Sequence, residues 1–234
     1  MTRLTSLLSF VLCVTFAGST LWVPDFGGFD ADQFPVPQND PPVQPAGYAF
    51  AIWGLIYLWL LIGMGYGLLR RPDDADWHAM RVPLCVSLAI GSVWLPVAVL
   101  SPVWASILIW AMLLPALVAL FRAPATDRGW ALLPVGLYTG WLSAASCVSL
   151  GLVAAGYGFM SEQTAAFVFV FMALVIASAV QNQLRRAPTY SIAVIWALIA
   201  IVVQNAGSDT TVAALAAGGA AALIVPAWRA FRTG

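Results

Sequence analysis

The sequence predicts an all-α protein, a polytopic transmembrane bundle of about eight helices. Hydrophobic residues make up 62% of the 234 residues and charged residues only 9%, against roughly 25% charged residues in a soluble domain. So few charges could not cover a water-soluble surface, which excludes a water-soluble enzyme. The net charge of zero also gives no basic surface for nucleic acid.

Eight apolar runs, each bounded by charged residues or by Pro and Gly, have about the 20-residue length that crosses a bilayer core. These expected spans are approximately residues 4–22, 47–69, 82–100, 103–121, 130–155, 164–184, 189–206 and 210–228. The first span has features of a cleaved signal peptide, with Arg3 before the apolar run and Ala17-Gly18-Ser19 near its end. Because the run continues to Trp22, we favour a retained helix over cleavage of residues 1–22.

The arginines predict the orientation of these spans. The chain has ten Arg and no Lys, and every Arg falls on the cytoplasmic side if the N-terminus is cytoplasmic. This distribution follows the positive-inside rule. We therefore expect an integral protein of a bacterial inner membrane, with both termini in the cytoplasm.

Residues 23–46 form the one long loop, which this orientation places outside the cytoplasm. It is rich in proline, which resists both helix and sheet. The prolines are Pro24, Pro35, Pro37, Pro41 and Pro42, followed by Pro45 at the entrance of the second span. The segment is interpreted either as an extended lid or as a plain linker.

The membrane interior lacks the groups that most chemistry requires. No span has an ionisable residue near its middle, which argues against a pump or an ion-coupled carrier. The only histidine, His78, lies in a polar segment beside Asp76, and Ser143, Ser146 and Ser149 have no histidine partner at membrane depth. We therefore expect no enzyme, no metal site and no required cofactor, and any tetrapyrrole would be held by shape and stacking.

Aromatic residues occupy several spans in place of polar ones. Phe50, Trp53 and Tyr57 are spaced to share one helix face, Trp94 precedes a proline, and Tyr138 and Trp141 are three residues apart. Such rings suit a cavity for a flat apolar ligand. They equally suit a packed aromatic core with no ligand, and composition alone does not separate these alternatives.

The order of these residues resembles that of the TspO/MBR family, the tryptophan-rich sensory proteins. The family's Pro-rich loop and the aromatic start of its next helix are matched by Pro45, Tyr48, Phe50, Trp53 and Tyr57, with Tyr48 in the place of a Trp. Val93-Trp94-Leu95-Pro96 matches its L-W-x-P element, and Trp104 matches the Trp that opens its fourth helix. Tyr138, Trp141 and Ala145 match P-Y-x-x-W-x-x-x-A, so the resemblance covers residues 23–155.

The resemblance implies a five-helix TspO-like unit in residues 1–155, followed by three additional transmembrane helices in residues 156–234. It implies a protein that binds porphyrins and other apolar ligands, with a sensory or regulatory role in pigment or tetrapyrrole metabolism. The ligand-binding residues that it implies are Tyr48, Phe50, Trp53, Tyr57, Trp94, Trp104, Tyr138 and Trp141. The expected partners are the lipid bilayer and an apolar small molecule, such as a bound porphyrin.

Two other functions stay open. The first is a structural or assembly subunit of a homo-oligomer or a larger membrane complex, for example a photosynthetic pigment–protein complex. It is motivated by small residues on the last span, Ala213, Ala214, Ala217, Gly218 and Ala221, which let helices pack closely; packing within the chain is the interpretation that we favour. The second is a facilitator of an apolar solute, which needs no charge within the membrane.

Overall fold

The computed structural model describes residues 2–23 and 26–233, so Pro24 and Asp25 of the long loop lie outside the described residues. The described chain is a bundle of eight long helices without strands, which confirms the predicted fold class. The helices are α1 (Thr2–Gly18), α2 (Ile52–Arg70), α3 (Ala75–Ala98), α4 (Pro102–Arg122), α5 (Leu132–Gly156), α6 (Glu162–Leu184), α7 (Pro188–Asn205) and α8 (Thr210–Arg232). Short 3₁₀ turns are η1 (Ser19–Leu21), η2 (Ala31–Gln33) and η3 (Gly47–Ala51). All eight helices, α1 and α2 together with their 3₁₀ turns, are long and apolar enough to cross a membrane.

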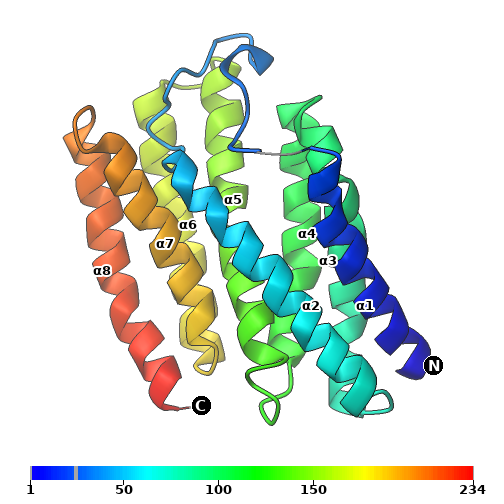
Figure 1. Ribbon diagram of the computed structural model, residues 1–234. Helices are drawn as coiled ribbons and strands as arrows, with labels where there is room; N and C mark the ends of the chain where they lie inside the picture. Colours follow the sequence, from blue (N-terminus) through cyan, green and yellow to red (C-terminus); the bar gives the residue numbers. More distant parts are fainter. Residues whose placement is uncertain (1, 24–25, 234) are drawn as a thin grey trace.

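Helix α5 is the centre of the bundle and contacts α2, α4, α6 and α7 (Figure 1). Helix α1 packs against α2 and α3 on one side, and α8 packs against α6 and α7 on the other. Close approach of α5 and α7 depends on Gly140, because a Cβ atom there would overlap the backbone carbonyl of Tyr190. The Tyr190 hydroxyl also donates to Ser143 Oγ at 2.9 Å, a hydrogen bond that joins α7 to α5.

Helix α3 begins at Ala75, well before the predicted span at residue 82. Asp74 caps it, since its carboxylate accepts hydrogen bonds from the backbone N–H groups of Asp76 and Trp77 at 3.0 and 3.1 Å. His78, expected in a solvated loop, therefore lies in the first turn of α3, and its Nδ1 atom is 2.8 Å from the hydroxyl of Thr5 on α1.

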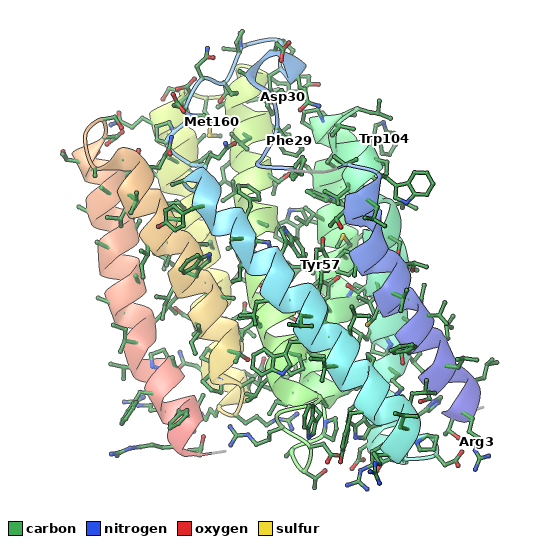
Figure 2. All side chains as sticks on the ribbon, in the orientation of Figure 1. Arg3, Phe29, Asp30, Tyr57, Trp104 and Met160 are labelled. Atoms are coloured by element: carbon green, nitrogen blue, oxygen red, sulfur yellow. The ribbon has the colours of Figure 1, made fainter. Side chains whose placement is uncertain are left out.

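Both described ends of the chain lie at one end of the bundle (Figure 1), together with Arg3, while Asp30 and Met160 lie at the other (Figure 2). Two ion pairs are found among the described residues at this arginine-rich end, Arg3–Asp73 at 2.8 Å and Arg71–Asp127 at 2.9 Å. The Arg71 guanidinium lowers the pKa of the Asp127 carboxyl group below its ordinary value, and the indole Nε1–H of Trp77 donates to the same carboxylate at 2.9 Å. The carboxylate thus joins the α2–α3 connection to the α4–α5 loop.

Most of the small-residue stripe of α8 does not pack within the chain, which contradicts the favoured interpretation of it. Ala214, Ala217, Gly218 and Ala221 are exposed, and only Ala213 is half-buried. The buried face of α8 is formed instead by Val212, Ala216, Gly219, Ala220 and Leu223, with Gly219 against the side chain of Leu174 on α6. The two faces differ because each residue turns a helix by 100°, so neighbouring positions point in different directions.

Candidate functional site: an aromatic cavity beneath the long loop

The described part of the long loop, residues 26–46, forms a lid over one end of the bundle. Gln33 Nε2 donates to the carbonyl of Val99 at 3.0 Å, and Val36 N donates to the carbonyl of Gly156 at 2.8 Å. Near its second end, the loop carbonyl of Pro42 accepts a hydrogen bond from Asn205 Nδ2 at 2.9 Å. These contacts tie the loop to the ends of α3, α5 and α7, which favours the lid interpretation over a plain linker.

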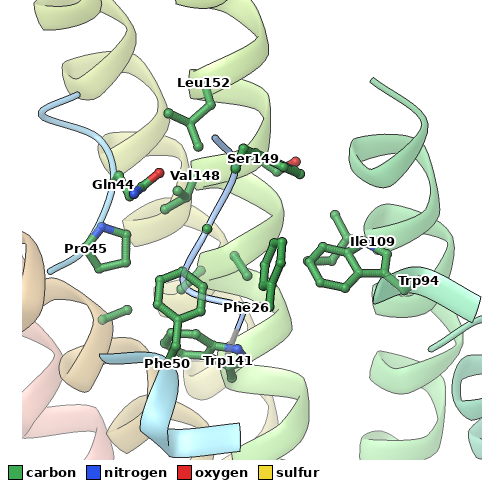
Figure 3. Close-up of a pocket in the computed structure, with 15 residues that line it drawn as sticks. Phe26, Gln44, Pro45, Phe50, Trp94, Ile109, Trp141, Val148, Ser149 and Leu152 are labelled. Atoms are coloured by element: carbon green, nitrogen blue, oxygen red, sulfur yellow. The ribbon is translucent and has the colours of Figure 1, made fainter. Parts of the chain in front are cut away.

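A cavity of about 50 Å³ lies directly beneath this lid (Figure 3). Five aromatic side chains line it: Phe26 and Phe29 from the lid, Phe50 from η3, Trp94 from α3 and Trp141 from α5. Aliphatic side chains such as Ile109, Val148 and Leu152 complete most of the remaining wall, with Gln44 and Ser149 as the polar members. An almost wholly apolar wall with few polar groups is typical of a small-molecule site.

Phe26 lies between the rings of Phe50 and Trp94 (Figure 3). Its ring centroid is 5.3 Å from that of Trp94 and 6.1 Å from that of Phe50, in both cases with the ring planes nearly perpendicular. Phe50 in turn contacts Trp141 edge-on at 6.0 Å. Edge-to-face packing is a favourable geometry for aromatic rings. The Phe26 ring of the lid therefore closes the cavity through favourable contacts with two rings of the bundle.

The two tryptophans of the wall differ in their hydrogen bonding. Trp94 Nε1–H donates to the backbone carbonyl of Ala105 at 2.9 Å, which fixes its indole. Trp141 Nε1–H is buried and has no partner among the described residues. A buried donor without an acceptor is uncommon in folded proteins. The cavity therefore has flat apolar walls, and one of its wall residues, Trp141, has an indole N–H group that bonds to no described residue.

A second layer of rings fills the space below the cavity. Trp53 and Tyr57 are stacked, with centroids 5.4 Å apart and planes at 16°, and Phe16 of α1 contacts both edge-on at 5.8 and 5.0 Å. Phe16 also contacts the fully buried Tyr138 at 5.7 Å, whose hydroxyl is 2.7 Å from Ser87 Oγ. These rings pack against one another beneath the cavity, and none of them is part of its wall.

Five of the eight predicted ligand-binding residues are thus not part of the cavity wall: Trp53, Tyr57 and Tyr138 of the layer below it, and Trp104 and Tyr48. Trp104 is 62% exposed and projects from the side of the bundle (Figure 2), at a position typical of the interfacial aromatic belt. Tyr48 is 45% exposed, with its ring edge-on to Trp196 at 5.5 Å. In the 3₁₀ turn η3 two residues span two thirds of a full rotation, so Tyr48 and Phe50 face different directions.

The family model described as TSPO-like protein matches residues 7–228. The chain belongs to this family. The match extends beyond the resembling segment 23–155 and includes α6 and α7 and nearly all of α8. Comparisons with curated proteins and with solved structures gave no match.

Sequence reasoning missed several residues of the site in this TSPO-like protein. Phe26 and Phe29 lie in the loop and Ala197 belongs to α7, outside the helices that were expected to form the site. The signal for the loop residues was an aromatic pair around Gly27 and Gly28 in an otherwise proline-rich, polar segment. Gly28 has φ +127°, a backbone conformation open essentially to glycine alone.

The cavity offers no ligand for a metal ion. Among the described residues, no group of three or more His, Cys, Asp or Glu side chains lies close enough together to hold one. The described cavity wall contains no imidazole, thiolate, thioether or carboxylate group. Such groups are the usual axial ligands of haem iron, so the wall suits a metal-free ring better than an iron-containing one.

Proposed function

We propose that this TSPO-like membrane protein binds a flat apolar ligand in the cavity beneath the lid, and that it senses or regulates tetrapyrrole or pigment metabolism through this ligand. The observation that carries the proposal is the buried indole N–H of Trp141, unpartnered among the described residues, in a wall of aromatic rings. A ligand that places one acceptor there would satisfy this donor, while its flat faces contact the rings. A metal-free porphyrin with carboxylate groups has this chemistry.

The size of the cavity defines how such a ligand would enter. Sites for drug-sized molecules have volumes of about 300–1,000 Å³, whereas the closed cavity has about 50 Å³. A tetrapyrrole therefore fits only if Phe26 leaves its place between Phe50 and Trp94. Glycine at position 28 makes this segment the most adaptable part of the lid backbone, and the hydrogen bonds of Gln33 and Val36 can persist while it moves.

This exchange of rings couples binding to the shape of the lid. In the closed state Phe26 occupies the aromatic site, and in the bound state the ligand occupies it. The displaced lid is then a conformation that exists only when ligand is bound, and a partner outside the membrane could bind this conformation selectively. The proposal therefore explains a sensory role without a catalytic step, and we propose that the protein is not an enzyme.

Binding is favoured over transport by the packing below the cavity. A facilitator needs a path that continues from the cavity to the arginine-rich end. The rings of Phe16, Trp53, Tyr57 and Tyr138 are packed against one another there. A ligand in the cavity thus meets a closed floor, as expected of a receptor.

Spectroscopic titration of the purified chain with metal-free protoporphyrin tests the proposal. We expect a saturable shift of the porphyrin absorption band, weakened by Phe50→Ala because Phe50 is part of the wall. Trp104→Ala and Tyr48→Ala are matched controls, since both residues belong to the family pattern but lie outside the cavity, and both should bind as the unchanged protein does. A linear, non-saturable response, or equal weakening in all three variants, would overturn the proposal.

The exposed small-residue face of α8 favours the assembly function as a second candidate. Ala214, Ala217 and Gly218 present little side-chain bulk, and a Cβ atom added at Gly218 would contact nothing within 4 Å. A helix of another chain could approach closely along this face. Native mass spectrometry in mild detergent tests this function: a complex that Gly218→Leu dissociates supports it, and a monomer removes it.

A further inference from the structure

A second cavity lies at the opposite end of the bundle from the lid, between the ends of α6 and α8. Its volume is about 310 Å³, and its wall contains Gln181, Asn182, Arg185, Pro226, Arg229 and Thr233. Arg185 and Arg229 bring two guanidinium groups to it. Among the residues that the structure describes, neither arginine forms an ion pair and no carboxylate side chain lines the cavity. Two guanidinium charges therefore meet at this cavity, and no carboxylate side chain of the described residues compensates them there.

One residue of the wall, Gln181, has a buried amide donor that bonds to no described residue. Gln181 is only 1% exposed, and its Oε1 atom accepts hydrogen bonds from both the backbone N–H and the hydroxyl of Ser191, at 3.3 and 2.8 Å. Since a backbone N–H can only donate, these bonds define which amide atom is oxygen. The remaining Nε2 group is buried and has no partner in the described part of the chain, which costs free energy until an acceptor is supplied.

The backbone at Arg185 is shaped to keep its side chain at this cavity. Arg185 ends α6 in the left-handed conformation, with φ +51°, a position usually taken by glycine. Its Nε–H donates to the carbonyl of Asn182 at 2.9 Å, while its two terminal nitrogens donate to no described residue. The Thr233 hydroxyl joins the end of α8 to this turn by donating to the carbonyls of Arg185 and Arg229.

The neighbouring surface places the cavity at the level of lipid headgroups. Trp228 and Phe231 on the same turns of α8 are exposed and stacked, with ring centroids 6.0 Å apart, and the Arg232 guanidinium lies over Trp228 at 5.3 Å. Exposed Trp beside Arg is typical of the boundary between the hydrocarbon core and water.

We propose that this cavity binds a phosphate oxyanion, with Arg185 and Arg229 as cationic ligands and Gln181 Nε2 as a neutral donor. Guanidinium groups bind phosphate oxygens with strong, charge-assisted hydrogen bonds, and basic pockets between transmembrane helices bind anionic lipid headgroups. The phosphodiester of an anionic phospholipid and a soluble phosphate share this chemistry. The α6–α8 cavity is thus a site separate from the apolar cavity beneath the lid.

The test titrates the purified full chain in detergent with phosphatidylglycerol, with phosphatidylcholine and with inorganic phosphate, and follows thermal unfolding and lipid retention by native mass spectrometry. The test variant is Arg185→Gly combined with Arg229→Gln. Glycine suits the left-handed backbone at position 185, so this change removes the guanidinium without straining the turn. The matched control is Arg70→Gln with Arg122→Gln, which removes the same charge at the same end but outside the cavity.

Phosphatidylglycerol should stabilise the unchanged protein more than phosphatidylcholine does. The test variant should bind phosphatidylglycerol about 25-fold more weakly, because each arginine near an anionic headgroup contributes roughly a factor of five, and the control should stay within about twofold. If that double variant does not fold, each single change should give about a fivefold loss. An equal effect of inorganic phosphate, lost in the same variant, assigns the site to soluble phosphate. Equal losses in test and control variants, or no preference for either anion over phosphatidylcholine, would overturn the proposal.

Discussion

The ring of Phe26 lies edge-on against the indole of Trp94, with 5.3 Å between the centroids and 83° between the planes. One ring belongs to the lid and the other to a transmembrane helix whose indole N–H is already fixed by the carbonyl of Ala105. Trp94 is thus held within the bundle, whereas Phe26 belongs to the lid. In the proposed function, this pair is the contact that a ligand would replace to enter the cavity.

Replacing Phe26 by Ala should strengthen ligand binding. Burial of a Phe side chain contributes roughly 1.5–3 kcal/mol, and in the variant a ligand no longer has to displace that ring. We expect protoporphyrin to bind about tenfold more tightly, measured by the absorption titration, with Phe231→Ala on the exposed end of α8 as control. Weaker binding in Phe26→Ala would mean that Phe26 contacts the bound ligand and does not occupy the ligand's place in the closed state.

Replacing Trp141 by Phe should remove its unpartnered indole donor while keeping an aromatic ring in the wall. A hydrogen bond to a charged acceptor contributes about 1.5–3 kcal/mol. Protoporphyrin, which has carboxylate acceptors, should therefore bind roughly 10- to 150-fold more weakly. A porphyrin with only alkyl substituents should bind both proteins equally. If both porphyrins lose affinity to the same extent, Trp141 acts through shape alone.

Replacing Gly156 by Val should loosen the lid. Phe34 of the lid packs directly against Gly156, where a Cβ atom would overlap its ring, and the Gly156 carbonyl holds Val36 N at 2.8 Å. We expect faster amide hydrogen exchange across residues 31–38 while α5 keeps its protection. Unchanged exchange in this segment would show that the lid does not depend on this contact.

Replacing Asp127 by Asn should destabilise the arginine-rich end. The Asp127 carboxylate accepts from Arg71 Nε and from the Trp77 indole, both at 2.9 Å, and its side chain is only 10% exposed. We expect a loss of about 1–3 kcal/mol of stability, measured by thermal unfolding in detergent. Arg3, whose partner Asp73 is half exposed, offers a control: Arg3→Gln should cost less than about 1 kcal/mol.

The same carboxylate sets a pH dependence. Its pKa in the folded protein is lowered, chiefly by the hydrogen bond from Arg71, so its contribution to stability is complete above the ordinary carboxyl pKa of 3.8. The contribution is lost as the pH falls from there through the lowered pKa of the folded state. Asp127→Asn should therefore differ most from the unchanged protein above pH 3.8 and progressively less below it. A constant difference across this range would contradict the assignment.

The sequence predicted the spans well because a bilayer imposes one length and one composition on every helix that crosses it. It missed the start of α3 because hydrophobicity detects the membrane-crossing part of a helix, whereas Asp74 caps α3 within a charged segment. Tyr48 and Trp104 were wrongly expected in the site because a motif does not specify the direction of each side chain. That direction changes by about 100° per residue in an α-helix, and the motif did not predict the 3₁₀ turn that precedes α2.

The lid residues of the site were beyond sequence reasoning for a different reason. No periodicity describes an irregular loop, so the position of Phe26 depends on tertiary contacts such as Phe34 with Gly156 and Pro42 with Asn205. By contrast Phe50, Trp94 and Trp141 lie on regular elements, and the order of their motifs was enough to group them. The family pattern therefore indicated three residues of the cavity wall together with five residues outside it, and it did not indicate the ring that closes the cavity.

A map of the protein determined with bound protoporphyrin would show directly whether the ligand occupies the cavity. We expect ligand density between Trp94 and Trp141, with an acceptor facing Trp141 Nε1 and with Phe26 moved out of the space that it fills in the closed state. Ligand density on the lipid-facing surface, with Phe26 still packed between Phe50 and Trp94, would contradict this expectation.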